Sequence, residues 1–155
     1  MKKNCTWCGG LDNDVLHNIG LLLFRSVLGF FMLTHGWQKI ENFQLMSAGF
    51  PDPIGIGSSA SLVLIIFAEF GCSLLLILGL FTRFATIPLI IGMMVAAFVI
   101  HAGDPFSKIE LSSLYLSLYV VLAILGPGKY SLDNVFGIFC EKYCKNCKPT
   151  NKMKI

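Results

Sequence analysis

The feature that most constrains this chain is an apolar run at residues 58–83, long enough to cross a membrane as a helix. About 20 consecutive apolar residues span the hydrocarbon of a bilayer, and between Ser58 and Thr82 the only charged residue is Glu69. A carboxylate inside a membrane is costly and by default indicates a function. The run therefore predicts a transmembrane helix with an acidic site near its middle.

The composition of the whole chain is that of an integral membrane protein. Apolar residues make up 55% of the 155 residues and charged residues 14%, whereas about 25% of a soluble domain is charged. The net charge of +3 is small and scattered, so nothing favours a basic face that binds nucleic acid. We expect the lipid bilayer to be the main partner and nucleic acid not to be one.

Three further apolar stretches predict three more helices. Prolines and glycines interrupt residues 39–59, which excludes one continuous helix there, and Gly126-Pro127-Gly128 ends the last span. The expected spans are residues 15–37, 58–80, 84–101 and 110–125, with the fourth the shortest. The predicted fold class is all-α, a polytopic four-helix bundle in the membrane.

Basic residues predict the orientation of this bundle. Four spans place both termini on one side, and cytoplasmic loops are rich in Lys and Arg. Only Lys39 and Lys108 lie toward the opposite side, whereas the side of the termini collects Lys2, Lys3, Arg83, Lys129, Lys142, Lys145, Lys148, Lys152 and Lys154. We therefore predict a cytoplasmic Cys-rich segment at residues 1–14, a membrane domain at 15–139 and a cytoplasmic basic, Cys-rich tail at 140–155.

Arg25 and Glu69 are predicted to form an ion pair inside the bundle. Counted at about 1.5 Å per residue from the predicted helix ends, both side chains reach a similar depth. An isolated Arg in lipid costs at least about 2.5 kcal/mol, so pairing is the economical arrangement. The pair either fixes helix register or forms a polar pocket or proton site.

A second polar group is predicted at the other end of the spans. His35 and Lys39 close the first span, His101 closes the third and Glu110 opens the fourth. Each of these residues is tolerated at an interface, where water satisfies it. Together they suit three roles: binding a small polar molecule, exchanging the protons of a quinol, or holding a metal such as zinc or iron.

Two Cys-x-x-Cys pairs lie outside the spans, and both are predicted to be cytoplasmic. The pairs are Cys5 with Cys8 and Cys144 with Cys147. Their spacing is that of a four-thiolate zinc or iron site. A redox-active dithiol pair, favoured by the flanking lysines, and incidental thiols are the alternatives, because a reducing cytosol disfavours structural disulfides.

Several motifs follow one another in order along residues 20–133. They are Arg25-x3-Gly29, His35-Gly36-x2-Lys39, Gly49-Phe50-Pro51, Glu69-x-Gly71, Leu78-Gly79-Leu80-x-Thr82-Arg83, His101, Glu110-x4-Tyr115-Leu116 and Gly126-Pro127-Gly128-x2-Ser131-Leu132-Asp133. This pattern resembles the DoxX family of bacterial four-helix inner-membrane proteins. Relatives in that family include the small subunit of thiosulfate:quinone oxidoreductase and membrane partners in thiol-redox complexes. The resemblance implies a location in the inner membrane and redox chemistry with quinone as the acceptor.

The predicted function is a membrane subunit of a quinone-linked oxidoreductase that acts on a small sulfur compound or on thiol equivalents. Residues that match the family pattern are assigned in two groups. The proton-exchanging, catalytic group is Glu69, His101 and Glu110, and the substrate- or quinone-binding group is Arg25, His35, Lys39 and Arg83. The sequence has no recognisable flavin, haem or dinucleotide motif, so we expect a partner redox subunit or a homo-oligomer.

Two other functional classes fit the same residues. A small transporter would use the Arg25–Glu69 core and the His and Glu cluster as a path for solute or protons. A membrane scaffold would dock soluble redox proteins through its Cys-rich ends. The sequence alone leaves open whether the chain has an activity of its own.

Overall fold

The computed structural model describes residues 13–143, with side chains described as far as residue 138. All regular secondary structure in this part of the chain is helical. The elements in chain order are α1 (Asn13–Glu41), α2 (Phe43–Met46), α3 (Ser58–Ile66), the π-helical segment η1 (Phe67–Cys72), α4 (Ser73–Leu78), α5 (Thr82–Val95), the π-helical segment η2 (Ala96–Ile100), α6 (Phe106–Leu125) and α7 (Leu132–Tyr143).

The all-α, four-span prediction is confirmed. Four helical stretches are long and apolar enough to cross a membrane: α1, then α3 to α4 through η1, then α5 with η2, and α6. The expectation that the fourth span is the shortest is wrong, because α6 has 20 residues and the third span has 19. The length of the fourth span was underestimated because hydropathy counts only the apolar part of a helix. The helix α6 begins directly after Pro105 and includes polar residues before the apolar part.

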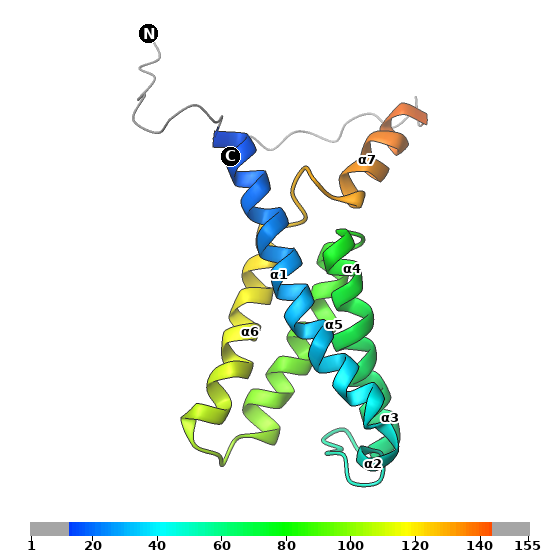
Figure 1. Cartoon of the computed structure of the whole chain (residues 1–155), viewed down its shortest axis with the longest axis vertical. Coiled ribbons are helices and arrows are strands. Elements are labelled where there is room, and N and C mark those ends of the chain that lie inside the picture. The colour runs from blue at the N-terminus through cyan, green and yellow to red at the C-terminus, as the bar shows by residue number, and fades with distance from the viewer. Residues whose placement is uncertain (1–12, 144–155) are drawn as a thin grey trace.

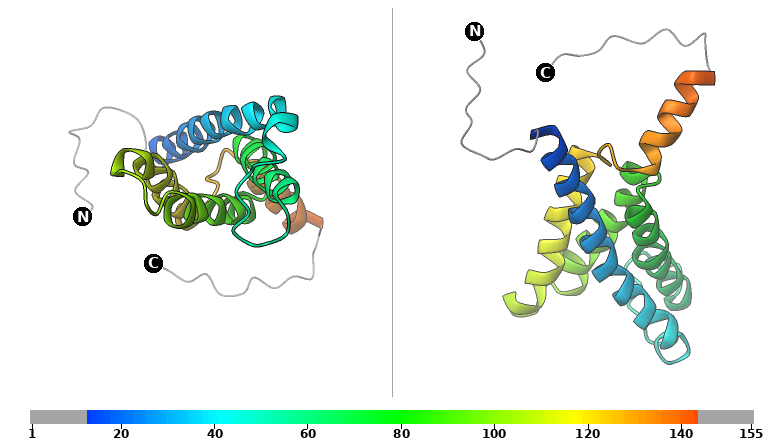
Figure 2. Two further views of the ribbon diagram at one scale, coloured as in Figure 1. Left: turned by 90° about the horizontal axis from the view of Figure 1, so that it is seen from below. Right: turned by 45° about the horizontal axis from the view of Figure 1, so that its top comes forward.

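The bundle has two ends, the terminal end and the loop end. The terminal end carries the start of α1, the turn between α4 and α5, and α7, and the loop end carries α2 and the turns before α3 and α6 (Figure 1). Much of α1 packs along the second span, α3–η1–α4, while α6 lies beside α5 (Figures 1 and 2). Which side of the membrane each end faces stays a prediction from the basic residues.

Close packing in the bundle depends on glycines of α1. A Cβ at Gly29 would lie 2.8 Å from a side-chain carbon of Ile77, and a Cβ at Gly36 would lie 2.7 Å from the backbone nitrogen of Phe70. Small residues allow helix backbones to approach this closely in membranes. The core beneath is formed by buried apolar side chains, among them Leu28, Met32, Cys72, Leu76, Leu89, Tyr119 and Leu122.

Polar side chains tie the terminal end together. The guanidinium of Arg25, only 2% exposed, donates to the backbone oxygens of Pro127, at 2.9 Å, and Tyr130. The Asn18 side-chain oxygen accepts from the backbone N–H of Lys129 at 2.7 Å. The break at Gly126-Pro127-Gly128 leaves these backbone groups without hydrogen-bond partners in a helix. Side chains of α1 supply the missing partners.

A second tie joins the start of α7 to the turn between α4 and α5. The Asp133 carboxylate accepts from the backbone N–H groups of Phe81, at 2.6 Å, and Thr82, at 2.9 Å, and the Asp133 N–H donates to the Gly79 oxygen. Phe81 has a φ of 47°, a conformation that is costly for a bulky residue. The carboxylate of Asp133 therefore holds a strained helix start in place.

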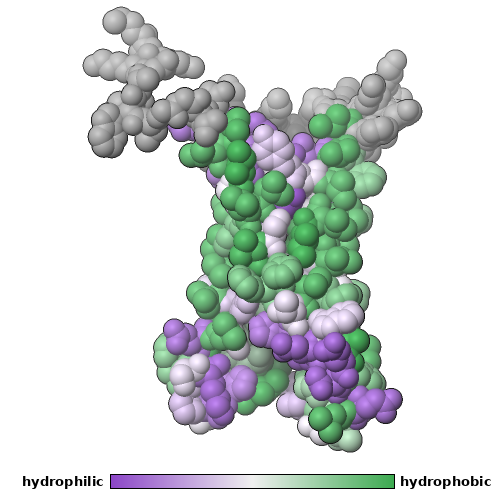
Figure 3. Space-filling view, viewed as in Figure 1, coloured by the Kyte–Doolittle hydropathy of each residue, from purple (hydrophilic) through white to green (hydrophobic). Residues whose placement is uncertain are grey.

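The outer surface of the bundle is apolar along most of its length. Large apolar side chains that are more than half exposed include Leu23, Phe30, Val63, Phe84 and Ile124. On the face seen in Figure 3, hydrophobic residues cover the middle of the bundle and hydrophilic residues gather toward the loop end. This is the surface expected of helices in contact with lipid, so bilayer contact follows from the structure.

Candidate functional site

A pocket of about 630 Å³ lies in the half of the bundle nearer the loop end. All four spans line it, together with a loop that contributes Phe50, Pro51, Pro53 and Ile54. Most of the lining side chains are apolar. The polar exceptions are His35, Lys39, Ser61, Glu69, His101, Ser112 and Tyr115.

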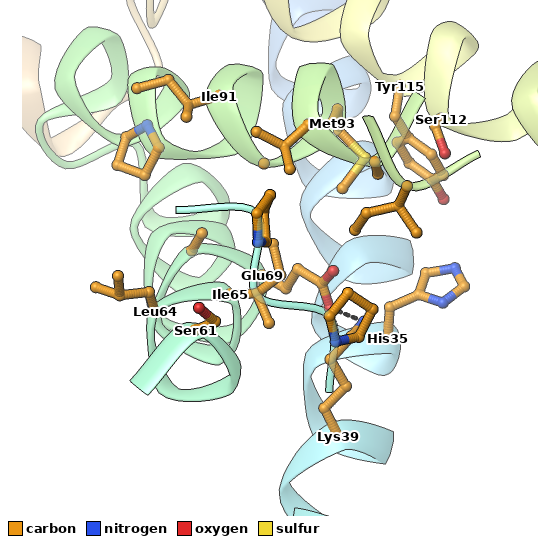
Figure 4. Close-up of a pocket in the computed structure, with 18 of the residues that line it drawn as sticks. His35, Lys39, Ser61, Leu64, Ile65, Glu69, Ile91, Met93, Ser112 and Tyr115 are labelled. Atoms are coloured by element: carbon orange, nitrogen blue, oxygen red, sulfur yellow. Dashed lines mark hydrogen bonds and ion pairs between the residues drawn. The ribbon is translucent and has the colours of Figure 1, made fainter. Parts of the chain in front are cut away.

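The Lys39–Glu69 ion pair is the strongest electrostatic feature of the pocket. The Lys39 Nζ atom lies 2.5 Å from the Glu69 Oε2 atom, and the two side chains are 21% and 6% exposed. Figure 4 shows Glu69 and Lys39 reaching toward each other from different helices, with His35 on the helix of Lys39. Removing either partner would leave the other as a buried group without its counter-ion, so the two side chains form one unit in the pocket lining.

Two π-helical segments flank the pocket. Glu69 lies within η1, and η2 ends at the residue before His101, whose N–H donates to the Ala96 oxygen at 3.1 Å. Short π-helical segments inside α-helices occur frequently at functional sites. One polar lining residue, Glu69, lies within such a segment and another, His101, directly follows one.

Aromatic side chains connect the pocket with the core of the bundle. The His35 and Tyr115 rings meet edge to face with centroids 6.2 Å apart. Tyr115 stacks on the buried Tyr119 with centroids 6.0 Å apart and an interplanar angle of 22°. These rings join α1 to α6 and offer flat surfaces against which a planar ligand packs.

A loop ordered by Asp52 covers part of the pocket. The Asp52 carboxylate accepts hydrogen bonds from the Ser61 hydroxyl at 2.8 Å and from the backbone N–H groups of Gly55, Ile56 and Gly57. The hydrogen bond from Ser61, followed by those from the backbone, holds the pKa of Asp52 below its usual range. One carboxylate therefore fixes the shape of the loop that supplies the Phe50–Ile54 lining.

Some residues that line the pocket also face the lipid. Leu64 is 52% exposed, Phe67 59% and Ile91 54%, and they come from α3, η1 and α5. The apolar lining of the pocket therefore includes side chains that are also accessible from outside the pocket, on the second and third spans.

The predicted Arg25–Glu69 ion pair is wrong. Glu69 pairs with Lys39 and Arg25 binds backbone oxygens, and along α1 the 14 steps from Arg25 to Lys39 span about 21 Å. The two depths were estimated by counting residues from the predicted helix ends. This estimate failed because α1 begins well before the level of the turn between α4 and α5. Arg25 lies beside Gly79 in that turn, so twelve residues of α1 extend beyond it.

The structure places the other predicted site residues at different positions. His35, Lys39 and His101 meet at the pocket as expected, whereas Glu110 is exposed and is not among the lining residues. Arg83 is exposed at the terminal end, close to Gly126. The predicted binding group of Arg25, His35, Lys39 and Arg83 is therefore divided between the two ends of the bundle.

The cysteine predictions fall mostly outside the described residues. Cys5, Cys8, Cys144 and Cys147 all lie there, so the zinc or iron site stays a prediction. Cys72, three residues after Glu69, is a free thiol that packs with the apolar core. Within the part of the chain that the structure describes, no group of three or more His, Cys, Asp or Glu residues is arranged to hold a metal ion.

Comparison with known proteins decides the family. The model of the DoxX family matches residues 20–102 of the chain. The chain belongs to the DoxX family. An uncharacterized protein of Haemophilus influenzae is 34% identical over 125 residues, which cover 75% of this chain and 90% of that protein.

A second relative bears on where this DoxX protein resides. The inner membrane protein YqjF of Escherichia coli is 29% identical over 124 residues, which cover 77% of this chain and 94% of YqjF. No solved structure matches the chain. Together with the four apolar spans, the family and this relative make it a multi-pass protein of the inner membrane.

Sequence reasoning missed two acidic residues near the pocket of this DoxX protein. Asp52 orders the covering loop, and Asp104 binds the His101 ring at 2.8 Å. The signals were present in the sequence, since an Asp before two glycines favours side-chain capping of backbone N–H groups. A His three residues before an Asp in a turn likewise places the two side chains near each other.

Proposed function

We propose that this DoxX protein is the quinone-binding membrane subunit of an oxidoreductase that acts on a small sulfur compound or on thiol equivalents. The observation that carries the proposal is the Lys39–Glu69 ion pair in a mostly apolar pocket of about 630 Å³. Such a volume is typical of small-molecule sites. The pairing of one polar region with apolar walls suits an amphipathic ligand.

The residues of the pocket fit a quinone. A quinone ring carries two carbonyl oxygens that accept hydrogen bonds, and Lys39 and His35 are donors in the lining. The ring of Tyr115 provides a flat packing surface, and the exposed lining residues Leu64, Phe67 and Ile91 offer apolar contacts to an isoprenoid tail. When bound, a quinone supplies two-electron redox chemistry in which each electron is accompanied by a proton.

The chain itself contributes binding, orientation and proton exchange. The Lys39 ammonium, held by Glu69, donates toward a ligand oxygen from a fixed position. Tyr115 and the Asp52-ordered loop form two further sides of the pocket that would hold the ligand. Electrons must come from a donor bound elsewhere, so the proposal includes a partner redox subunit or a second copy of the chain.

The transporter alternative is less favoured by the packing. Between the pocket and the terminal end, the side chains of Leu28, Leu76, Leu89 and Leu122 are 4% exposed or less and belong to one core cluster. A solute path would have to pass through this cluster. The scaffold alternative depends on the Cys-rich ends, which lie outside the described residues.

Co-purification and direct binding test the proposal. Protein purified in mild detergent is extracted for mass spectrometry of quinones, and a short-chain ubiquinone analogue is titrated by calorimetry. We expect bound quinone, saturable binding of the analogue, and binding weakened about tenfold by Lys39→Met, the loss of one charged hydrogen bond. Lys108→Met is the matched control, because Lys108 is 62% exposed at the same end of the bundle.

Electron transfer is tested in membranes that contain the protein. Thiosulfate or a dithiol should reduce the analogue faster than in membranes without the protein. Absence of both co-purified quinone and saturable binding would overturn the proposal. So would equal effects of Lys39→Met and Lys108→Met, because the pocket would then not be the binding site.

A further inference from the structure

His101 and Asp104 form a hydrogen-bonded dyad beside the pocket. The His101 Nδ1 atom lies 2.8 Å from Asp104 Oδ2, and the Asp104 N–H donates to the His101 backbone oxygen at 3.0 Å. His101 lines the pocket, and its side chain is also 33% exposed. One imidazole ring therefore belongs both to the ligand site and to the solvent-accessible loop end.

The carboxylate of Asp104 determines which ring nitrogen is available. An ionised carboxylate only accepts hydrogen bonds, so Nδ1 carries a hydrogen and donates it. The hydrogen bond from His101, and more weakly the charge of Lys108 at 3.5 Å, hold the pKa of Asp104 below its usual range. With Nδ1 engaged, Nε2 is the ring nitrogen that remains for proton exchange.

The other charged and titratable groups near His101 have different surroundings. From α6, Lys108 faces Asp104, Glu110 is exposed and Tyr115 lines the pocket. From the other spans, the pocket lining contributes His35 and the ion pair of Lys39 with Glu69. Lys39 is engaged by Glu69 within the pocket. Of the two histidines in the lining, His101 is the one whose ring nitrogen meets a carboxylate.

We propose that Asp104 is a positioning residue that directs Nε2 of His101 to exchange a proton between a ligand in the pocket and water at the loop end. This inference rests on the proposed function. In the step, the N–H bond at Nε2 breaks and an O–H bond forms on a ligand oxygen, while the electron pair of the N–H bond stays on the neutral imidazole. Solvent at the loop end then returns a proton to the same nitrogen. The sulfur donor of the proposed function supplies the electrons.

The tautomer of His101 is a readout that does not depend on activity. The chain has 3 histidines, so full-length protein labelled with ¹⁵N-histidine in detergent gives few ring signals, which His→Gln variants assign. We expect neutral His101 to carry its hydrogen on Nδ1. Asp104→Ala should shift it toward the Nε2–H form, Asp104→Glu should restore the Nδ1–H form, and Lys108→Gln should leave it unchanged.

Addition of the short-chain ubiquinone analogue tests the ligand side of the dyad. The Nε2 signal of His101 should move, while the signals of His17, exposed on α1 near the terminal end, should not. Asp104→Ala should slow thiol-dependent reduction of the analogue at least ~10-fold, less than the 10²–10⁴ of a complete general acid, and change its binding less than about twofold.

The outcomes separate the dyad from the proposed function. A wild-type Nε2–H tautomer, or binding of the analogue with unmoved His101 signals, would overturn the dyad while leaving quinone binding in place. Failure of the wild-type protein to bind the analogue, with His101 in its expected tautomer, would overturn the proposed function. Equal movement of the His17 and His101 signals would also contradict the inference, because the effect would then be nonspecific.

Discussion

Lys39 Nζ lies 2.5 Å from Glu69 Oε2, although 30 positions separate the two residues in the chain. The carboxylate belongs to η1 and the ammonium to the last turn of α1. Gly36, one turn before Lys39, brings the backbones of α1 and η1 together. Close backbone packing therefore lets a long cationic side chain reach a carboxylate deep within the second span.

Breaking this pair should be more harmful than removing both partners. Lys39→Met leaves a buried carboxylate without its cation, and we expect a loss of ~3 kcal/mol in the free energy of unfolding, the lower end for buried pairs because Lys39 is 21% exposed. Lys39→Met combined with Glu69→Gln should be milder. Unfolding in mixed detergent micelles measures both variants.

The double substitution of Lys39 and Glu69 needs a control pair whose effects on the free energy of unfolding simply add. Arg25, the other buried charged residue, provides it together with Glu69. Arg25→Gln and Glu69→Gln should add to within about 0.5 kcal/mol, because the two side chains have no partner in common. A strong coupling between Arg25 and Glu69, or none between Lys39 and Glu69, would contradict the structure.

Gly79 should not tolerate a side chain. Its φ is 68°, and a Cβ there would overlap the guanidinium of Arg25. We expect Gly79→Ala to cost at least ~1–3 kcal/mol from backbone strain alone, and to lower the melting temperature in detergent. Gly20→Ala is the matched control, since a Cβ at Gly20 meets no atom within 4 Å, and alanine in a helix is favoured by about 1 kcal/mol. Equal melting temperatures for the two variants would argue against the tie at the terminal end.

The loop over the pocket should loosen in acid. The pKa of Asp52 is lowered by its hydrogen bonds from Ser61 and the backbone of residues 55–57. The stabilisation is thus fully present above the unfolded-state pKa of about 3.9, and it is lost as the pH falls through the lower folded-state pKa. Hydrogen exchange of residues 55–57 measures the effect.

Asp52→Asn provides the comparison for this pH dependence. At neutral pH the wild-type amides should exchange more slowly than those of the variant, and the difference should disappear in acid. A difference that persists unchanged below the folded-state pKa would show that the charge of Asp52 is not what holds the loop.

Metal at the terminal cysteines is a prediction of the sequence that elemental analysis can test. Protein purified without oxygen should contain zinc or iron, and substitution of Cys5, Cys8, Cys144 and Cys147 by Ser should remove it. Cys72→Ala is the control, because Cys72 is buried in the core of the bundle. Metal-free protein with freely alkylated terminal thiols would exclude the site.

The sequence by itself determined the four spans, the family and the group of polar residues near one membrane boundary. These follow from local properties: the length of apolar runs, the break at Gly126-Pro127-Gly128, and residue types that match a family pattern. His35, Lys39 and His101 were assigned together because each ends a predicted helix at the same boundary, and helix ends at one boundary lie near one another.

Only the tertiary structure decided which charges pair and which acidic residues serve the pocket. Pairing depends on the offset between helices, and α1 starts twelve residues before Arg25 reaches the level of Gly79. The hydrogen bonds of Asp52 and Asp104 depend on loop conformations that hydropathy does not describe. A sequence gives the order of side chains along each helix, whereas the relative height of two helices is set by the close packing at glycines such as Gly29 and Gly36.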